Sequence, residues 1–175
     1  MPGDGGRSAE GGSAVKLTPV ADIAKQIAST LESALGRLRG VLPDAEIHHV
    51  GATALPGAIT KGDVDLVVRV DREQFGAVIA LLSTRFGRKQ EENWSSTFGS
   101  FGDDDGYDLP LGIQVVVRGA GEDIFLHQRD YLRANRDVLE RYNRIKSTHA
   151  GDAADGYWQA KNAFFGELIQ DFRPE

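Results

Sequence analysis

The sequence predicts an α+β fold, in which a small mixed β-sheet is flanked by helices and covered by more helices at its C-terminal end. Two observations predict it. Short β-rich runs are mixed with one amphipathic segment in the middle of the chain, and the last third has a helical pattern. This order of elements is typical of α+β proteins, whose helices gather on one face or at one end of a sheet.

The first predicted element is a long amphipathic helix. Thr18 is its expected N-cap, Pro19 occupies the first helical position, and Gly40 is expected to end it. The apolar residues at helical spacing are Val20, Ile23, Ile27, Leu31, Leu35 and Leu38.

Two strands and a second helix are predicted next. Residues 46–50 form a short strand that runs into the turn 51–54, and residues 63–70 form the clearest strand of the chain. Asp71 is expected to cap the following helix, with Gln74 completing a variant of the capping box. The expected buried face of that helix is Phe75, Val78, Ile79, Leu82 and Phe86.

The rest of the chain predicts two more strands and a helical cover. One strand is expected within 93–101, a turn at 103–106, and another strand at 113–117. Aromatic residues of the last helix, Trp158 among them, are expected to serve in packing. The three predicted C-terminal helices are 123–134, 136–147 and 155–171.

Composition limits the class of protein. Residues 1–14 have almost nothing to bury and are predicted to be a disordered tail, which leaves 15–175 as a single domain. The chain has no Cys and no run of about 20 apolar residues, so a cytoplasmic location without membrane contact is the default expectation. The net charge of −6 disfavours binding to long nucleic acids, but a small phosphorylated ligand needs only local cations.

The candidate chemistry lies between the turn and the clearest strand. Asp63 and Asp65, at i and i+2 on a strand, should point to the same face, where a divalent cation would relieve their repulsion. Mg²⁺ (or Mn²⁺) accepts two carboxylates and keeps positions for water and phosphate. In the turn, Gly51 and Ala52 would offer backbone N–H groups to a phosphate. Thr53 adds a hydroxyl, and Lys61 adds a positive charge.

This arrangement resembles the nucleotidyltransferase superfamily, whose pattern is a hydrophobic residue, Gly-Gly or Gly-Ser, about ten residues and then Asp-h-Asp/Glu-h. Here Val50-Gly51-Ala52 is followed, ten residues later, by the strand that carries both aspartates. More specifically, the chain resembles the GrpB family, which also occurs fused to some bacterial dephospho-CoA kinases. The resemblance rests on residues 49–57 and Lys61-Gly62, and it extends over about 17–171.

Further segments that resemble the GrpB pattern lie in the predicted C-terminal helices. The family's Arg-Asp-Tyr-Leu-Arg stands at 129–133, and its two Tyr…Lys pairs stand at Tyr142/Lys146 and Tyr157/Lys161. The resemblance implies that Arg129, Tyr157 and Lys161 contribute to a phosphate-binding site. His49, which precedes the turn, is a further candidate.

Several positions depart from the family pattern. Ala52 replaces a serine, Gly62 replaces a proline, and Gly112 and Gln114 stand where the late strand often has His-x-His. No third carboxylate is evident, and activation of an acceptor hydroxyl therefore lacks an obvious base.

The leading hypothesis is a metal-dependent nucleotidyltransferase-like enzyme that binds a nucleoside triphosphate or similar phosphorylated ligand and acts on a small-molecule or protein acceptor. Two alternatives remain open. One is a nucleotide-binding or partner-binding module without turnover, and the other is the same scaffold recruited to a different biosynthetic reaction, because a fold does not fix a function.

Overall fold

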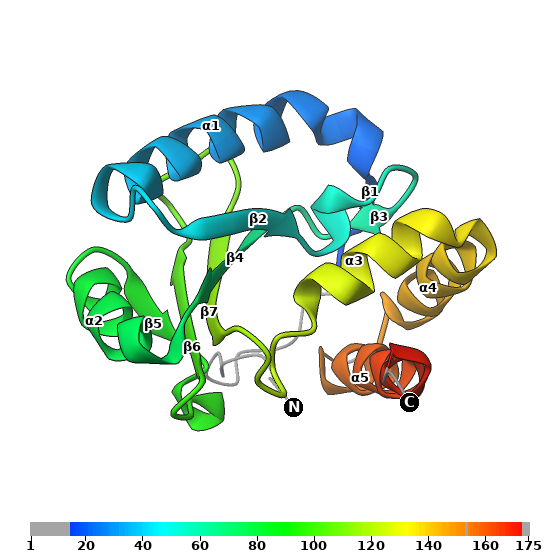
Figure 1. Cartoon of the computed structure of the whole chain (residues 1–175). Coiled ribbons are helices and arrows are strands. Elements are labelled where there is room, and N and C mark those ends of the chain that lie inside the picture. Colours follow the sequence, from blue (N-terminus) through cyan, green and yellow to red (C-terminus); the bar gives the residue numbers. More distant parts are fainter. Residues whose placement is uncertain (1–14, 153, 173–175) are drawn as a thin grey trace.

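A five-stranded mixed β-sheet forms the centre of the molecule (Figure 1). The structure is a computed structural model, and it describes residues 15–152 and 154–172. The second and third strands in spatial order pair in parallel and the other pairings are antiparallel, which confirms the predicted mixed sheet. The strands, in spatial order, are β2 (Glu46–Val50), β4 (Val64–Val70), β7 (Leu111–Val117), β6 (Phe98–Asp103) and β5 (Gly87–Lys89).

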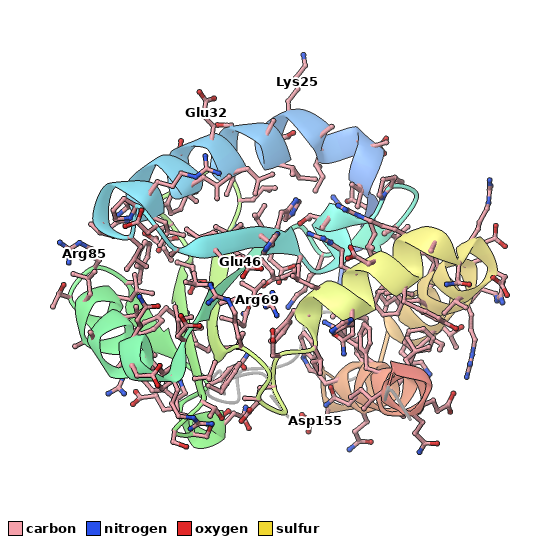
Figure 2. The ribbon with its side chains drawn as sticks, in the orientation of Figure 1. Lys25, Glu32, Glu46, Arg69, Arg85 and Asp155 are labelled. Atoms are coloured by element: carbon pink, nitrogen blue, oxygen red, sulfur yellow. The ribbon has the colours of Figure 1, made fainter. Side chains whose placement is uncertain are left out.

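Two helices cover one face of the sheet. These are α1 (Ala24–Val41) and α2 (Arg72–Ser83), and their apolar sides form one core with β4, β6 and β7. The predicted capping box of α2 is confirmed, with the Asp71 and Gln74 side chains each bonded to the backbone of the other. Lys25 and Glu32, on the outer side of α1, point away from the sheet (Figure 2).

The last three helices lie to one side of the sheet (Figure 1). They are α3 (Phe125–Ala134), α4 (Arg136–His149) and α5 (Ala154–Phe172), close to the predicted positions. They share an apolar cluster of their own, into which Leu55 and Ala58 of the segment after β2 also pack. The other sheet face therefore meets a separately packed helical layer, and a site can form where the two meet.

The predicted start of the first helix is wrong. Thr18 and Pro19 form the short strand β1 (Thr18–Pro19), which pairs with β3 (Ile59–Thr60). A 3-10 turn, η1 (Val20–Ile23), precedes α1, and the helix ends at Val41, one residue after the glycine expected to end it. Pairing with a segment about forty residues away overrides the local capping signal.

Other boundaries differ as well. Asp63 precedes β4 and is not part of it. The single strand predicted within 93–101 is wrong in extent: β6 begins at Phe98, and before it lie β5 and a 3-10 turn, η3 (Glu91–Asn93). The predicted turn 51–54 contains a 3-10 turn, η2 (Ala52–Ala54). The predicted disordered tail, 1–14, lies outside the described residues.

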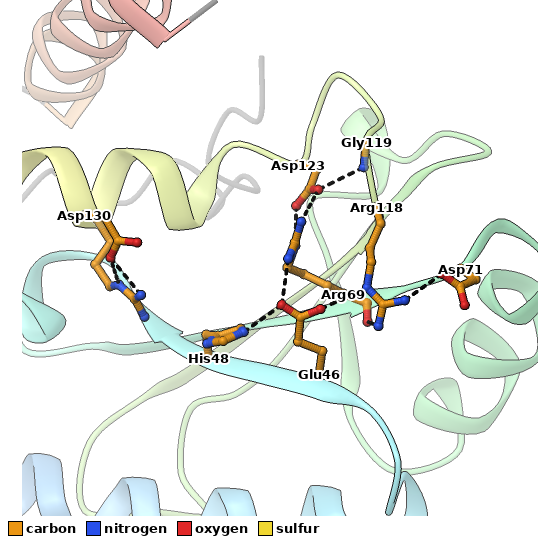
Figure 3. Close-up of polar contacts among 9 residues, drawn as sticks. Glu46, His48, Arg69, Asp71, Arg118, Gly119, Asp123 and Asp130 are labelled. Atoms are coloured by element: carbon orange, nitrogen blue, oxygen red, sulfur yellow. Dashed lines mark hydrogen bonds and ion pairs between the residues drawn. The ribbon is translucent and has the colours of Figure 1, made fainter. Parts of the chain in front are cut away.

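A network of ion pairs ties the sheet to the approach to α3 (Figure 3). Arg69 of β4 bonds Asp123 through two nitrogens, both at 2.7 Å, and Glu46 of β2 at 2.6 Å. Arg118 bonds the other Glu46 oxygen at 2.9 Å and Asp71 at 2.6 Å. The network fixes the chain between β7 and α3, and so the position at which α3 begins. Across residues 15–152 and 154–172, no helix is long and apolar enough to span a membrane.

Candidate functional site

A cavity of about 250 Å³ lies between the start of β4 and the C-terminal helices. Its wall includes residues from the turn after β2, from β4 and β7, and from α3, α4 and α5. Four cationic side chains and two carboxylates face it. The chain as a whole has a net charge of −6, so the excess of cations here is a local feature. The charged residues of the wall are Lys61, Asp63, Asp65, Arg129, Lys146 and Lys161.

Two glycines make room for the Asp65 carboxylate. A Cβ added to Gly51 would stand 2.5 Å from Asp65 Oδ2, and one added to Gly112 would stand 2.5 Å from Asp65 Oδ1. Gly112 is the direct partner of Asp65 in the parallel β4–β7 register. Gly51 also has φ +74°, a conformation that favours glycine. The departure at position 112 therefore leaves space that the Asp65 carboxylate occupies.

Gln114 is the polar neighbour of Asp65 on β7. Its side chain hydrogen-bonds the Asp65 carboxylate, while its Oε1 atom is buried and has no hydrogen-bond partner among the described residues. An amide can orient a carboxylate and offer an oxygen, but it cannot ionise. Gln114 thus supplies polarity without the charge that a third carboxylate would bring.

The neighbouring Asp63 carboxylate adds to the cost of ionising Asp65. Burial first, and then the neighbouring Asp63 carboxylate, raise the pKa of Asp65 to about 7, although Lys161 and Lys61 act in the opposite direction. Asp63 pairs with Lys61, whose Nζ lies 3.4 Å from Asp63 Oδ2. A further positive charge beside Asp65 would relieve this strain.

The residues present fit a divalent cation. Two adjacent carboxylates that face a cavity match the ligand needs of Mg²⁺, which is commonly held by one or two carboxylates together with substrate phosphates. Within 15–152 and 154–172, no cluster of three or more His, Cys, Asp or Glu side chains is placed to hold a metal ion. Any cation here would therefore rely on the ligand for the rest of its coordination.

The turn after β2 is held in place by side chains on both sides. Thr53 is buried, and its hydroxyl lies 2.9 Å from His49 Nε2. Neither residue is part of the cavity wall. Burial first, and then Arg133 and Arg129, lower the pKa of His49 to about 4. A neutral His49 bonded to Thr53 shapes the turn, while Gly51 and Ala52 face the cavity.

Two arginines of α3 grip the same turn. Arg133 donates through Nε and Nη2 to the Ala54 carbonyl at 2.9 and 2.7 Å, and Arg129 donates to the His49 carbonyl at 3.1 Å. Arg129 also pairs with Asp130 at 2.8 Å and lines the cavity. The two arginines of the Arg-Asp-Tyr-Leu-Arg segment therefore join α3 to the turn, and Arg129 adds one cation to the site.

Lys146 is the most buried of the four cations. Its side chain is 2% exposed, and its Nζ donates to the Ile59 carbonyl and lies 4.1 Å from the centroid of the Tyr142 ring. Burial first, and then Lys161, lower the pKa of Lys146 to about 7. Burial thus favours the neutral amine of Lys146 more than that of an exposed lysine.

The start of α5 closes the cavity. Tyr157 is buried, and burial raises its pKa to about 12, so it stays a neutral phenol. Lys161 lies one turn further along the helix. Trp158, expected to serve in packing, is partly exposed and lines the cavity beside both of them.

The structure brings most of the predicted site residues together. Eight of the ten line the cavity, and His49 and Thr53 lie behind the turn. Reasoning from the sequence missed Trp158 and the burial of Lys146. The signal for Lys146 was present in the first Tyr…Lys pair, Tyr142/Lys146, but the polar pattern of its helix favoured a solvated face. The eight cavity residues are Gly51, Ala52, Lys61, Asp63, Asp65, Arg129, Tyr157 and Lys161.

Similarity to solved structures defines the fold as the nucleotidyltransferase type. A crystal structure of the conserved protein GrpB from Enterococcus faecalis superposes with a TM-score of 0.69 and 20% identity, over 89% of this chain and 96% of that one. Cid1, described as having RNA terminal uridylyl transferase activity, superposes with a TM-score of 0.50 and 18% identity, over 71% of this chain and 39% of Cid1.

Sequence similarity gives the family. A family model described as GrpB protein matches residues 18–171. A UPF0157 protein of Vibrio cholerae is 32% identical over 133 residues, which is 75% of this chain and 70% of the relative. A UPF0157 protein of Halalkalibacterium halodurans is 27% identical over 153 residues, 77% of this chain and 71% of the relative. The chain belongs to the GrpB family, as the motifs of its sequence predict.

Proposed function

We propose that the cavity binds a divalent metal ion together with a nucleoside triphosphate or a similar phosphorylated small molecule. On this proposal the protein is a nucleotidyltransferase-like enzyme that acts on a small-molecule or protein acceptor. One observation carries it: a cation-rich cavity in an acidic protein also contains two adjacent carboxylates.

The charges of the cavity favour a polyanion. Four cationic side chains face two carboxylates, and a divalent ion held by the carboxylates would add further positive charge. A triphosphate carries enough negative charge to balance this sum, whereas a neutral ligand would leave the cations unpaired in a partly buried site. The −6 net charge of the whole chain argues against a long nucleic acid as the acceptor.

The residues would have separate roles. Asp63 and Asp65 would hold Mg²⁺ (or Mn²⁺), and a bound Mg²⁺ would neutralise charge on the transferring phosphate. Gly51 and Ala52 would present backbone N–H groups to the phosphates. Lys61, Arg129 and Lys161 would balance their charge, and Tyr157 would form the wall of the site. His49 and Thr53 would act by holding the turn.

The fold supports the class of reaction. Cid1, whose described activity is RNA terminal uridylyl transfer, shares the fold at a TM-score of 0.50. Phosphoryl and nucleotidyl transfer require mostly positioning and charge neutralisation, which glycine turns, carboxylates and cations provide. The cavity supplies each of these groups.

A second candidate is a nucleotide-binding module without turnover. It is favoured by Gly112 and Gln114, which supply no ionisable side chain beside Asp65. Nucleotide binding would then persist while activation of an acceptor hydroxyl lacked a carboxylate base. Both candidates use the same cavity, so they differ in whether pyrophosphate is released.

Calorimetric titration with a panel of nucleoside triphosphates, with and without Mg²⁺, tests the binding. Wild-type protein is expected to bind at least one of them in a Mg²⁺-dependent way, and the Asp63→Asn, Asp65→Asn double variant is expected to lose that dependence. Glu32→Gln is the matched control, because Glu32 is an exposed carboxylate on the outer side of α1 (Figure 2). Undiminished affinity in the double variant would contradict the proposal.

Pyrophosphate release separates the two candidates. Release that depends on an added small-molecule or protein acceptor identifies an enzyme. Mg²⁺-dependent binding without release across an acceptor panel favours the binding module.

A further inference from the structure

Trp158 connects two of the cations in the cavity wall. Lys61 Nζ lies 4.3 Å, and Lys161 Nζ 4.8 Å, from the centroid of the Trp158 ring. The two lysines come from distant parts of the chain, one from the connection between β3 and β4 and the other from α5. The ring itself is oriented by Tyr157, which it meets edge to face at 5.3 Å and 88°.

Both lysines also lie close to the aspartates. Lys61 pairs with Asp63 at 3.4 Å, and Lys161, like Lys61, lies near enough to Asp65 to act on its ionisation. The ring, the two ammonium groups and the two carboxylates therefore occupy one part of the cavity. Unlike the carboxylates, the Trp158 ring attracts the two ammonium groups without neutralising their charge.

The ring adds a second attraction to the one that the carboxylates exert on the two lysines. Two ammonium groups repel each other, and each stands on a flexible stem with several rotatable bonds. An aromatic face attracts both groups and limits their rotamers, while it leaves their positive charge available to a ligand. Restricting a group before a ligand arrives lowers the cost of binding.

The geometry points to Trp158 as a positioning residue, which holds Lys61 and Lys161 ready for the phosphate chain of the ligand. This inference rests on the proposed function and deepens it, because it assigns the contact to the polyphosphate and not to the nucleobase. Trp158 acts through the lysines, and its replacement weakens binding of any ligand with the same phosphate chain.

The test is calorimetric titration with inorganic tripolyphosphate and with ATP, both with Mg²⁺. Trp158→Leu is expected to weaken the binding of each by about three- to tenfold, the size expected for two lost cation–π contacts. Trp158→Phe keeps an aromatic face and is expected to restore affinity to within about twofold of wild type. Trp94→Phe is the matched control, since Trp94 also carries a cation, Arg88 at 3.9 Å, but lies outside the cavity wall.

A double-mutant cycle distinguishes positioning from packing. In a Lys61→Gln, Lys161→Gln background, Trp158→Leu is expected to cause no further loss of tripolyphosphate affinity, because the groups through which it acts are absent. The melting temperature of each ligand-free variant shows whether the fold is intact. An equal loss in both backgrounds would overturn the inference.

The remaining outcomes separate this inference from the proposed function. Loss of ATP binding with unchanged tripolyphosphate binding would place Trp158 against the nucleobase and overturn the inference alone. Unchanged binding of both ligands by Trp158→Leu would also overturn the inference and leave the proposed function standing. If the wild-type protein binds neither tripolyphosphate nor any nucleoside triphosphate of the panel, the proposed function fails and the inference fails with it.

Discussion

Two charged regions lie on one face of β4, and they differ in how their charges are paired. Around Arg69, each charge has partners at 2.6 to 2.9 Å, and the guanidinium is shared between Glu46 and Asp123 (Figure 3). Around Asp65, four residues earlier on the strand, the described residues form one looser ion pair, Lys61–Asp63 at 3.4 Å. The charges around Arg69 are fully paired by neighbouring side chains, and those around Asp65 are paired incompletely.

The difference indicates separate roles. Saturated pairs with bidentate geometry fix the elements that they join, here β2, β4 and the approach to α3. Incompletely paired charges beside a cavity cost stability, and such groups gather where a ligand completes the pairing. The comparison predicts that changes around Arg69 lower stability, and that changes around Asp65 lower binding.

The largest expected effect on binding comes from Asp65→Asn. We expect Mg²⁺-dependent nucleotide affinity to fall by about 100-fold, because the amide carries no charge for the metal ion. The ligand-free variant should melt at or above the wild-type temperature, since the repulsion between Asp63 and Asp65 is removed. A melting temperature clearly below wild type would show that Asp65 stabilises the fold.

Arg69→Met should lower the stability of the fold and leave nucleotide binding unchanged. It leaves Glu46 and the Asp123 side chain, which is 7% exposed, without their main cation. We expect the free energy of unfolding to fall by about 2 kcal/mol, below the range for fully buried pairs because Arg69 is partly exposed. Urea unfolding measures it. A weaker nucleotide affinity at temperatures where the variant stays folded would show that the two regions are not separate.

Gly112→Ala tests the space around Asp65. The new Cβ would stand 2.5 Å from Asp65 Oδ1, so the carboxylate must move, and we expect about tenfold weaker Mg²⁺-dependent binding. The matched control is Gly36→Ala in α1, where an added Cβ meets nothing within 4 Å and the helix should gain about 0.5–1 kcal/mol. Unchanged affinity in Gly112→Ala would mean that the observed Asp65 orientation is not needed.

A smaller effect on the stability of the fold is expected at acidic pH. Burial would raise the pKa of Glu46, but hydrogen bonds from His48, Arg69 and Arg118 outweigh it and lower the pKa to about 2. A lowered carboxyl pKa contributes stability above the unfolded value of 4.5, and that stability is lost as the pH falls towards 2. Glu46→Gln should therefore be less stable than wild type at pH 6, and the difference should shrink between pH 4.5 and 2. A difference independent of pH would contradict the pairing.

The sequence predicted the parts of the molecule that depend on local pattern. The strand that carries Asp65, the capping box at Asp71 and the C-terminal helices each follow from residue spacing. The pairing of β1 with β3 was missed, because a two-residue strand has no period and depends on a distant partner.

The candidate site was predicted in part for the same reason. The spacing of Gly51 and the aspartates predicted that the turn and the carboxylates lie together, and they line one cavity. The burial of Lys146 and the place of Trp158 depend on how α4 and α5 pack, which their own sequence pattern does not specify. The Arg69 network joins three separate segments and leaves no signal in any one of them.

The most direct measurement is anomalous X-ray diffraction from crystals grown with Mn²⁺ and a nucleoside triphosphate. A manganese peak in contact with the carboxylates of Asp63 and Asp65, with the phosphates towards Lys61 and Lys161, is the predicted result. Nucleotide bound elsewhere, or bound in the cavity with manganese away from both aspartates, would contradict the account.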